Sequence, residues 1–256
     1  MEKPAIERLG RHGARLKDLR RRIKNRRLGE VIVDGRRLVA DLVRWGVPIS
    51  ELYLKPEMVA GKESEVWIQA AGSTFEVEGS VLADLAPSRS PQGVLAIAEE
   101  PKSSAWTADG GVALWLDGVQ DPGNLGGIVR AAAGLGAAAV LLSQGCADPF
   151  GASAVRGAAG SVFRIPVERN VDGNEAVARV RNSGGEVWAS GSGGVPVEAW
   201  RPAEPCLILV GAEGAGLDSA VVDLADGTVT IPMDRDVESL NVAVAAGILL
   251  QRLRNV

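Results

Sequence analysis

The chain has 256 residues, 46% of them apolar, so it is long enough for one large or two modest domains. Its single histidine, His12, counts strongly against Ser-His-Asp or Cys-His catalysis and a histidine-based zinc site. Cys146 and Cys206 are far apart in sequence and suggest neither a disulfide framework nor a metal site, which fits a reducing cytoplasm. A polar N-terminus and the lack of a long apolar run predict neither a secretory signal nor a membrane span.

The net charge of −4 is distributed unevenly along the chain. Residues 1–28 contain eleven Lys or Arg and three acidic residues, so this segment carries +8 and the remainder carries −12. A solvated, charged helix would give the same run, but the asymmetry favours a nucleic-acid partner bound at one end. The arginines expected to contact RNA in this segment are Arg20, Arg21, Arg22, Arg26 and Arg27.

The first hundred residues predict a small α/β module. Leu9, Leu16, Leu19 and Ile23 fall on one helical face, and Gly29 ends that helix. Strands are then expected at 30–35, 49–54, 74–77 and 93–98, and helices at 36–45, 62–71 and 81–85. Residues 101–111 are rich in turn formers and small polar residues, and we predict a linker there.

Strands and helices alternate again after the linker. Strands are expected at 112–116, 138–142, 165–167, 186–190, 206–210 and 228–233, and helices at 125–135, 175–181, near 218–224 and after 239. This alternation is typical of a mainly parallel sheet that is covered by helices on both faces.

Two loops near the C-terminus are candidates for a ligand site. Residues 211–217 form a glycine-rich turn after an apolar strand, where a ligand can approach the backbone closely. Ser239 stands where the N-cap of the last helix is expected. Both loops would follow the carboxyl ends of strands, the usual ligand position in open α/β sheets. From spacing alone, two ordinary strand–helix turns remain an equal alternative.

Three separated motifs resemble those of the SpoU (TrmH-type) RNA ribose methyltransferases. Residues 124–130 look like the first motif, residues 210–217 like the second, and residues 231–233 with 239–245 like the third. Residues 156–163 are similar to the intermediate segment of the family. Residues 16–27, 33–38 and 90–94 look like the ribosomal-protein-like substrate-binding domain that precedes many members, with Asp34 where the family usually has Glu.

The resemblance implies a SPOUT-type α/β fold with a C-terminal trefoil knot, preceded by a smaller α/β domain. It divides the chain into an RNA-binding domain at 1–100, a linker at 101–111 and a catalytic domain at 112–256. It also implies S-adenosylmethionine as the methyl donor, RNA as the partner, a homodimer, and a ribose 2′-hydroxyl as the acceptor. Neither a metal nor a membrane is implied.

The resemblance also assigns roles to single residues. Arg130 is implied as the group that activates the ribose hydroxyl; because a guanidinium is effectively always protonated, we expect it to hold phosphate and stabilise alkoxide charge. Arg156 is a second candidate phosphate contact. The remaining site residues implied are Asn124, Glu213, Ser239 and Asn241 for the chemistry, and Gly211, Ile231, Met233 and Leu240 for the donor.

Alternative functions remain open at this point. Large-subunit (23S) ribosomal RNA is the favoured substrate, and tRNA is the alternative. A catalytically silent RNA-binding protein of the same fold is a second alternative, against which the intact polar motif residues count. A nucleotide-dependent oxidoreductase is disfavoured, because the glycines at 211, 214 and 216 have the wrong order for the dinucleotide-binding fingerprint.

Overall fold

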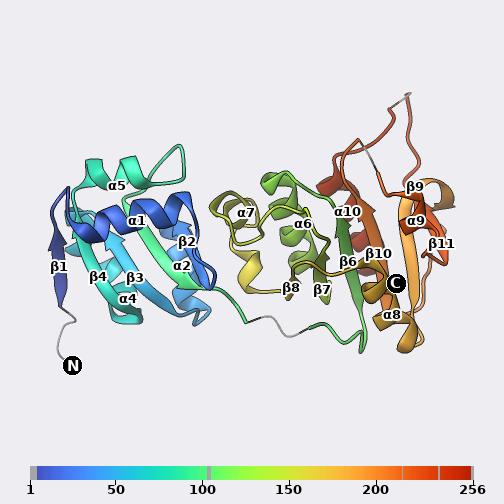
Figure 1. Cartoon of the computed structure of the whole chain (residues 1–256), viewed down its shortest axis with the longest axis horizontal. Coiled ribbons are helices and arrows are strands. Elements are labelled where there is room, and N and C mark those ends of the chain that lie inside the picture. Colours follow the sequence, from blue (N-terminus) through green and yellow to red (C-terminus); the bar gives the residue numbers. More distant parts are fainter. Residues whose placement is uncertain (1–4, 103–104, 215, 236, 255–256) are drawn as a thin grey trace. The chain divides into compact units, whose positions relative to one another are not determined.

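The computed structural model describes residues 5–102, 105–214, 216–235 and 237–254. The chain forms two compact units, one made of residues 1–101 with 150–163 and the other of residues 102–149 with 164–256. Each unit is a β-sheet with helices packed on it (Figure 1). The expected α/β fold with a parallel sheet is confirmed. No helix in the described ranges is long and apolar enough to cross a membrane.

The first unit is a mixed five-stranded sheet. Its strands are β1 (Ile6–Leu9), β2 (Glu30–Asp34), β3 (Ile49–Leu54), β4 (Ala71–Val77) and β5 (Val94–Glu99). Its helices are α1 (Ala14–Lys24), α2 (Arg36–Arg44), α3 (Pro56–Val59), α4 (Lys62–Ala70) and α5 (Gly79–Leu85). The strand order is β1-β4-β3-β5-β2, with β5 antiparallel to β2 and β3 and the other pairs parallel. The strands and helices expected for this module are present, but two details of the first helix were wrong. Leu9 lies in the additional edge strand β1 and not on the helix, and α1 ends at Lys24, before Gly29.

The second unit is an entirely parallel six-stranded sheet. Its strands are β6 (Val112–Asp117), β7 (Ala139–Leu142), β8 (Val167–Glu168), β9 (Glu186–Pro196), β10 (Cys206–Gly211) and β11 (Gly227–Thr230). Its helices are α6 (Pro122–Leu135), α8 (Gly173–Asn182), α9 (Ser219–Val222) and α10 (Val242–Arg254). The strand order is β11-β9-β10-β6-β7-β8.

Apolar side chains on both faces hold this sheet in place. Trp115, Leu207 and Leu209 belong to a core on the face that α8 covers. Leu114 and Ile208, on alternate positions of the same strands, are also fully buried, on the opposite face. The strands of a parallel sheet that is covered on both faces have nearly continuous apolar sequences, and the strands of this unit have such sequences.

The boundaries of the units differ from the expected ones in two places. Trp106 and Ala108, expected in a linker, are buried in the core of the second unit. The Trp106 backbone is also bonded to side chains: its N–H donates to Glu168, and its carbonyl accepts from Arg179. A residue anchored in this way is part of the fold, so the unit begins before β6.

Residues 150–163, expected in the catalytic domain, group with the first unit instead. They contain α7 (Ala152–Gly157) and the short 3₁₀ helix η1 (Ser161–Phe163). A β-carbon on Gly160 would lie 2.4 Å from Cδ1 of Leu38 and 3.1 Å from the Trp45 ring. The absence of a side chain at this position, which has a φ of +79°, therefore allows the segment to pack against α2 and Trp45.

A buried arginine joins α1 to the sheet of the first unit. Arg22 is only 5% exposed, and its Nε and Nη2 donate to the two oxygens of Glu30 at 2.8 and 3.0 Å. Its Nη1 lies 3.0 and 3.1 Å from the oxygens of Glu51. The Tyr53 hydroxyl also donates to Glu51. Burial, and then the Glu51 carboxylate, raise the pKa of Tyr53, which keeps this donor protonated.

We predict that Arg22→Gln destabilises the first unit by about 3 kcal/mol, because it leaves two partly buried carboxylates without their cation. The control is Arg21→Gln, which removes an exposed arginine paired only with Asp18 and is expected to cost less than about 1 kcal/mol. Urea unfolding of the full chain, followed by circular dichroism, measures both changes. Equal midpoints for the two variants would contradict a structural role for Arg22.

Candidate functional site

The carboxyl ends of all strands in the second unit lie at one edge, because the sheet is parallel. The chain leaves β6 towards β7 on one side, whereas β10 lies on the other side of β6. The last residues of these neighbours, Asp117 and Gly211, are paired in register. Open α/β sheets bind ligands at such a point, where the strand order changes direction. The loops that follow β6 and β10 are therefore the candidate site.

The loop after β10 folds tightly on itself. A β-carbon on Gly211 would lie 2.2 Å from the carbonyl carbon of Gly216 and 2.5 Å from the nitrogen of Leu217. The N–H of Gly216 donates to the carbonyl of Ala212 at 3.0 Å, which closes the turn. Position 211 therefore accepts only glycine in this conformation, and the backbone of the turn is left uncovered by a side chain there.

Glu213 bridges this loop to the beginning of α10. Its Oε1 accepts from Nδ2 of Asn241 at 2.6 Å and from the N–H of Val242 at 3.2 Å. Nδ2 of Asn241 also donates to Oδ1 of Asn124, at 2.8 Å. Three of the residues predicted for the site are thus joined through their side chains, although Asn124 and Asn241 are 117 residues apart.

The sequence predicted Ser239 as the N-cap of α10, and this prediction is wrong: the N-cap is Asn241. Oδ1 of Asn241 accepts from the N–H groups of Ala243 and Val244 at 3.0 and 3.4 Å. Ser239 is exposed, two residues before the cap. Asparagine caps helices as well as serine does, and its amide nitrogen remains available for Asn124 and Glu213, which a serine hydroxyl cannot provide at the same time.

The helices α6 and α10 begin side by side and run parallel. A β-carbon on Gly127 would lie 3.1 Å from Cβ of Ala243, and one on Gly247 would lie 3.9 Å from Cβ of Ala131. Both contacts advance along the two helices in the same direction. The small residues therefore bring the two helices close together, with the asparagines of the first and third motifs at the same end.

Arg130 lies on α6 and is exposed. It stands six residues after Asn124, about 9 Å further along the helix axis. No hydrogen bond or ion pair joins its guanidinium to any residue in the described part of the chain, in contrast to the bonded trio of Asn124, Glu213 and Asn241. Its five N–H donors are therefore available to an anion.

Of the four residues predicted to contact the donor, Gly211 ends β10, and the other three lie between β11 and α10. Ile231 follows β11 directly and, like Gly211 and Leu240, is half-buried. Met233 is 36% exposed. Three of the four are apolar and none is charged, so these positions suit contacts through backbone groups next to an apolar surface. No cluster of His, Cys, Asp and Glu suitable for a metal occurs among the described residues.

A glycine-rich irregularity within β9, which the sequence analysis did not single out, follows the residues of β9 that pair with β10. Ala189 of β9 pairs with Leu209 of β10, and the pairing of β9 with β11 then shifts from Ala189 to Val195. Residues 190–194 are therefore left out of the regular pairing between β9 and β11. A β-carbon on Gly194 would lie 2.1 Å from the carbonyl oxygen of Thr228, so glycine is required there. The run Ser-Gly-Ser-Gly-Gly after an apolar strand was the available signal.

Two of the arginines predicted to bind RNA are paired with carboxylates of the first unit. Arg22 is buried between two carboxylates, and Arg26 is 12% exposed, with Nη1 2.8 Å from the Glu100 carboxylate. Their charges are thus paired inside the first unit, and RNA binding by these two residues stays a prediction. The sequence could not show the pairing with Glu51 and Glu100, because these two carboxylates are distant along the chain.

The other predicted arginines are exposed. Arg21 and Arg27 share the Asp18 carboxylate, at 2.5 and 2.6 Å. Arg20 and Arg156 have no carboxylate partner in the described ranges, and Arg156 is 3.5 Å from the Ser153 hydroxyl. Arg156 belongs to α7 and therefore to the first unit, whereas Arg130 belongs to the second.

Two family models match the chain. The SpoU rRNA Methylase family matches residues 111–251, and an MRM3-like substrate binding domain matches residues 14–96. A similar curated protein is the 23S rRNA (guanosine(2553)-2′-O)-methyltransferase RlmP of Bacillus subtilis (strain 168), 33% identical over 87% of this chain and 88% of that protein. An uncharacterized tRNA/rRNA methyltransferase of Mycolicibacterium gilvum (strain PYR-GCK) is 33% identical over 87% of this chain and 75% of that protein.

Solved structures agree with these matches. The SpoU methyltransferase AviRb from Streptomyces viridochromogenes, in complex with AdoMet, is 28% identical and covers 95% of this chain and 98% of that chain, with a TM-score of 0.83. An AdoMet-bound rRNA methyltransferase from Sinorhizobium meliloti is 29% identical over 98% of both chains, with a TM-score of 0.81. The chain therefore belongs to the SpoU rRNA methylase family, as its three motifs predict.

Proposed function

We propose that this protein transfers a methyl group from S-adenosylmethionine to a ribose 2′-hydroxyl of 23S ribosomal RNA. The observation that carries the proposal is the bonded set of Asn124, Glu213 and Asn241 at the carboxyl edge of the parallel sheet. The relative RlmP, which this chain matches over most of both lengths, is named as a 23S rRNA 2′-O-methyltransferase. Two similar structures contain AdoMet.

The residues at this edge fit a nucleoside donor. Gly211 leaves the backbone of its loop accessible, while Ile231, Met233 and Leu240 offer apolar surface and backbone N–H and C=O groups. S-adenosylmethionine supplies a methyl group on a sulfonium, and its transfer needs in-line approach and no metal. The contribution of the protein is then to hold the hydroxyl near the donor and to exclude water.

Arg130 is the residue that we assign to the acceptor. Its unpaired guanidinium holds the phosphate next to the target ribose and stabilises the alkoxide charge that develops on the 2′-oxygen. Asn124 and Asn241 orient the ribose, while Glu213 keeps Asn241 and the first turn of α10 in place. Ser239 is exposed near the same loop and is available for a further contact with the ligand.

The alternative substrate is tRNA, since several relatives are named as tRNA/rRNA methyltransferases. The RlmP match, together with the MRM3-like substrate binding domain, favours ribosomal RNA. A catalytically silent protein is disfavoured, because its polar set would have no reason to stay intact and bonded. The cytoplasm, where ribosomal RNA is available, is the location that this function requires.

We also propose a homodimer that uses α10. Val244 and Ile248, one helical turn apart, are 51% and 36% exposed, so α10 presents an apolar strip that another copy of the chain would cover. The trefoil knot that the family implies would place this helix next to the donor loops, so that dimer formation and the site would share one element.

Replacing Gly211 with alanine should weaken donor binding, since the added methyl group collides with the backbone at positions 216 and 217. The dissociation constant for S-adenosylmethionine, measured by calorimetry, is expected to rise by at least about tenfold. Gly134→Ala, where no atom lies within 4 Å of the added carbon, is the control and should bind normally. Normal binding by the Gly211 variant would remove this loop from the donor site.

Arg130→Ala and Arg130→Lys should each lower turnover by at least about 100-fold while donor binding stays nearly intact, because neither restores a planar guanidinium. The assay maps ribose methylation in unmodified 23S rRNA and tRNA incubated with the protein and S-adenosylmethionine. Methylation of 23S rRNA by the wild type supports the proposal, and methylation of tRNA alone supports the alternative. Unchanged turnover in either variant would remove Arg130 from the mechanism.

The dimer is tested by Val244→Asp. A charge placed in the apolar strip of α10 should convert the dimer to a monomer in sedimentation experiments, because burying an unpaired carboxylate is costly. The control is Val66→Asp on α4, where the valine is similarly exposed, at 58%. A wild-type monomer, or an intact dimer of the Val244 variant, would contradict this interface.

A further inference from the structure

The basic residues of α1 and the turn after it fall into two sets with different surroundings. Arg22 is inside the first unit with its charge neutralised, and Arg21 and Arg27 share Asp18. Lys17, Arg20 and Lys24 are exposed, and none of them has a hydrogen bond or ion pair with any described residue. Arg15 and Arg26 also have carboxylate partners, Glu51 and Glu100. Among the described basic residues of α1 and this turn, Lys17, Arg20 and Lys24 are therefore those without a carboxylate partner.

The unpaired cations share one face of the helix. At 3.6 residues per turn, positions 17, 20 and 24 fall within about 60° of one another around the helix axis. The apolar side of α1, with Leu16 and Leu19, is fully buried against the sheet. Asp18 lies outside this arc, next to Arg21. The three cations therefore form a strip with no carboxylate of α1 inside it.

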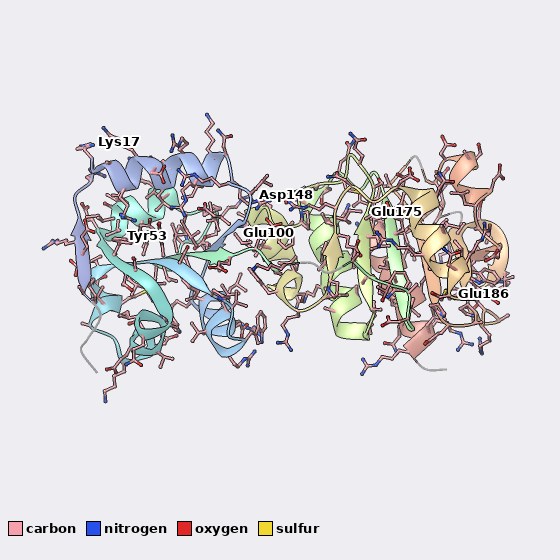
Figure 2. The ribbon with its side chains drawn as sticks, turned by 60° about the horizontal axis from the view of Figure 1, so that its bottom comes forward. Lys17, Tyr53, Glu100, Asp148, Glu175 and Glu186 are labelled. Carbon is pink, nitrogen blue, oxygen red and sulfur yellow. The ribbon has the colours of Figure 1, made fainter. Side chains whose placement is uncertain are left out.

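The strip faces away from the fold. Figure 2 shows Lys17 on the side of α1 opposite the sheet, with its side chain extending away from the ribbon. Lys24 stands in the last turn of the helix, where cations are favoured by the helix dipole. The charged ends of Lys17, Arg20 and Lys24 therefore lie along one line on the surface, over about two turns of the helix.

We propose that Lys17, Arg20 and Lys24 bind the phosphates of one RNA strand that runs along α1. This inference rests on the proposed function, because it takes RNA as the substrate. Charge complementarity identifies the partner: three aligned, unpaired cations match a line of phosphates, and a strip without aromatic or apolar side chains offers no surface for base stacking. The contact positions the RNA and does not read its sequence.

This assignment predicts the salt dependence of RNA binding. Each phosphate contact contributes about 0.7 to 0.9 to the slope of log affinity against log salt concentration, so losing three contacts lowers the slope by about two. The triple variant K17Q/R20Q/K24Q should bind an rRNA fragment at least about tenfold more weakly near 0.15 M salt. Its affinity for S-adenosylmethionine should be unchanged, because the donor loops are in the second unit.

The matched control is R8Q/R44Q/K62Q, which removes the same charge from exposed positions elsewhere in the first unit. Arg8 pairs with Glu76 and Arg44 with Asp41, and Lys62 begins α4. Filter binding of a 23S rRNA fragment over a salt series gives the affinities and the slopes, and circular dichroism checks that each variant is folded. A lower slope in the α1 variant alone supports the inference.

An equal decrease of the salt-dependence slope in both triple variants would contradict RNA binding by Lys17, Arg20 and Lys24, since net charge alone would then explain the affinity for RNA. An unchanged slope in the α1 variant would also overturn it. These failures are distinct from a failure of the proposed function, which would appear in the wild type as a lack of RNA binding or of methyl transfer.

Discussion

The site depends on one carboxylate, that of Glu213. It accepts hydrogen bonds from the Asn241 side chain and from the first backbone N–H of α10, and thereby fixes the loop after β10 to the beginning of the last helix. Hydrogen bonds to a charged group are stronger than those between neutral groups, and a carboxylate at a helix N-terminus is further favoured by the helix dipole. Asn241 extends the connection to Asn124 in the first turn of α6, so the loop after β10 and the beginnings of α6 and α10 are joined through side chains.

Close backbone packing makes this arrangement possible. Gly211 allows the β10 loop to turn back on itself, and Gly127 allows α6 to approach Ala243 of α10. Side chains at these glycines would separate the elements that carry Asn124, Glu213 and Asn241. Arg130 is different, because no hydrogen bond or ion pair joins its guanidinium to another residue in the described ranges. In the proposed function, this leaves its N–H groups available to a phosphate of the RNA.

Much of this could be predicted from the sequence, because parallel strands read as apolar runs and the site residues stand in three local motifs. What could not be predicted depends on contacts between distant residues. The pairing of Arg22 with Glu51 cannot be read from a basic run, and neither can the packing of residues 150–163 on the first unit. Ser239 was an equally good local candidate for the helix cap, but only the amide of Asn241 also reaches Glu213.

We propose that the loops at 211–217 and 239–242 together form one donor site. Hydrogen–deuterium exchange of the whole protein, with and without S-adenosylmethionine, tests it most directly. We predict slower exchange in both loops together when the donor is added, and no change when NAD is added instead. Protection confined to one loop, or located elsewhere in the chain, would show that the two loops do not share one donor site.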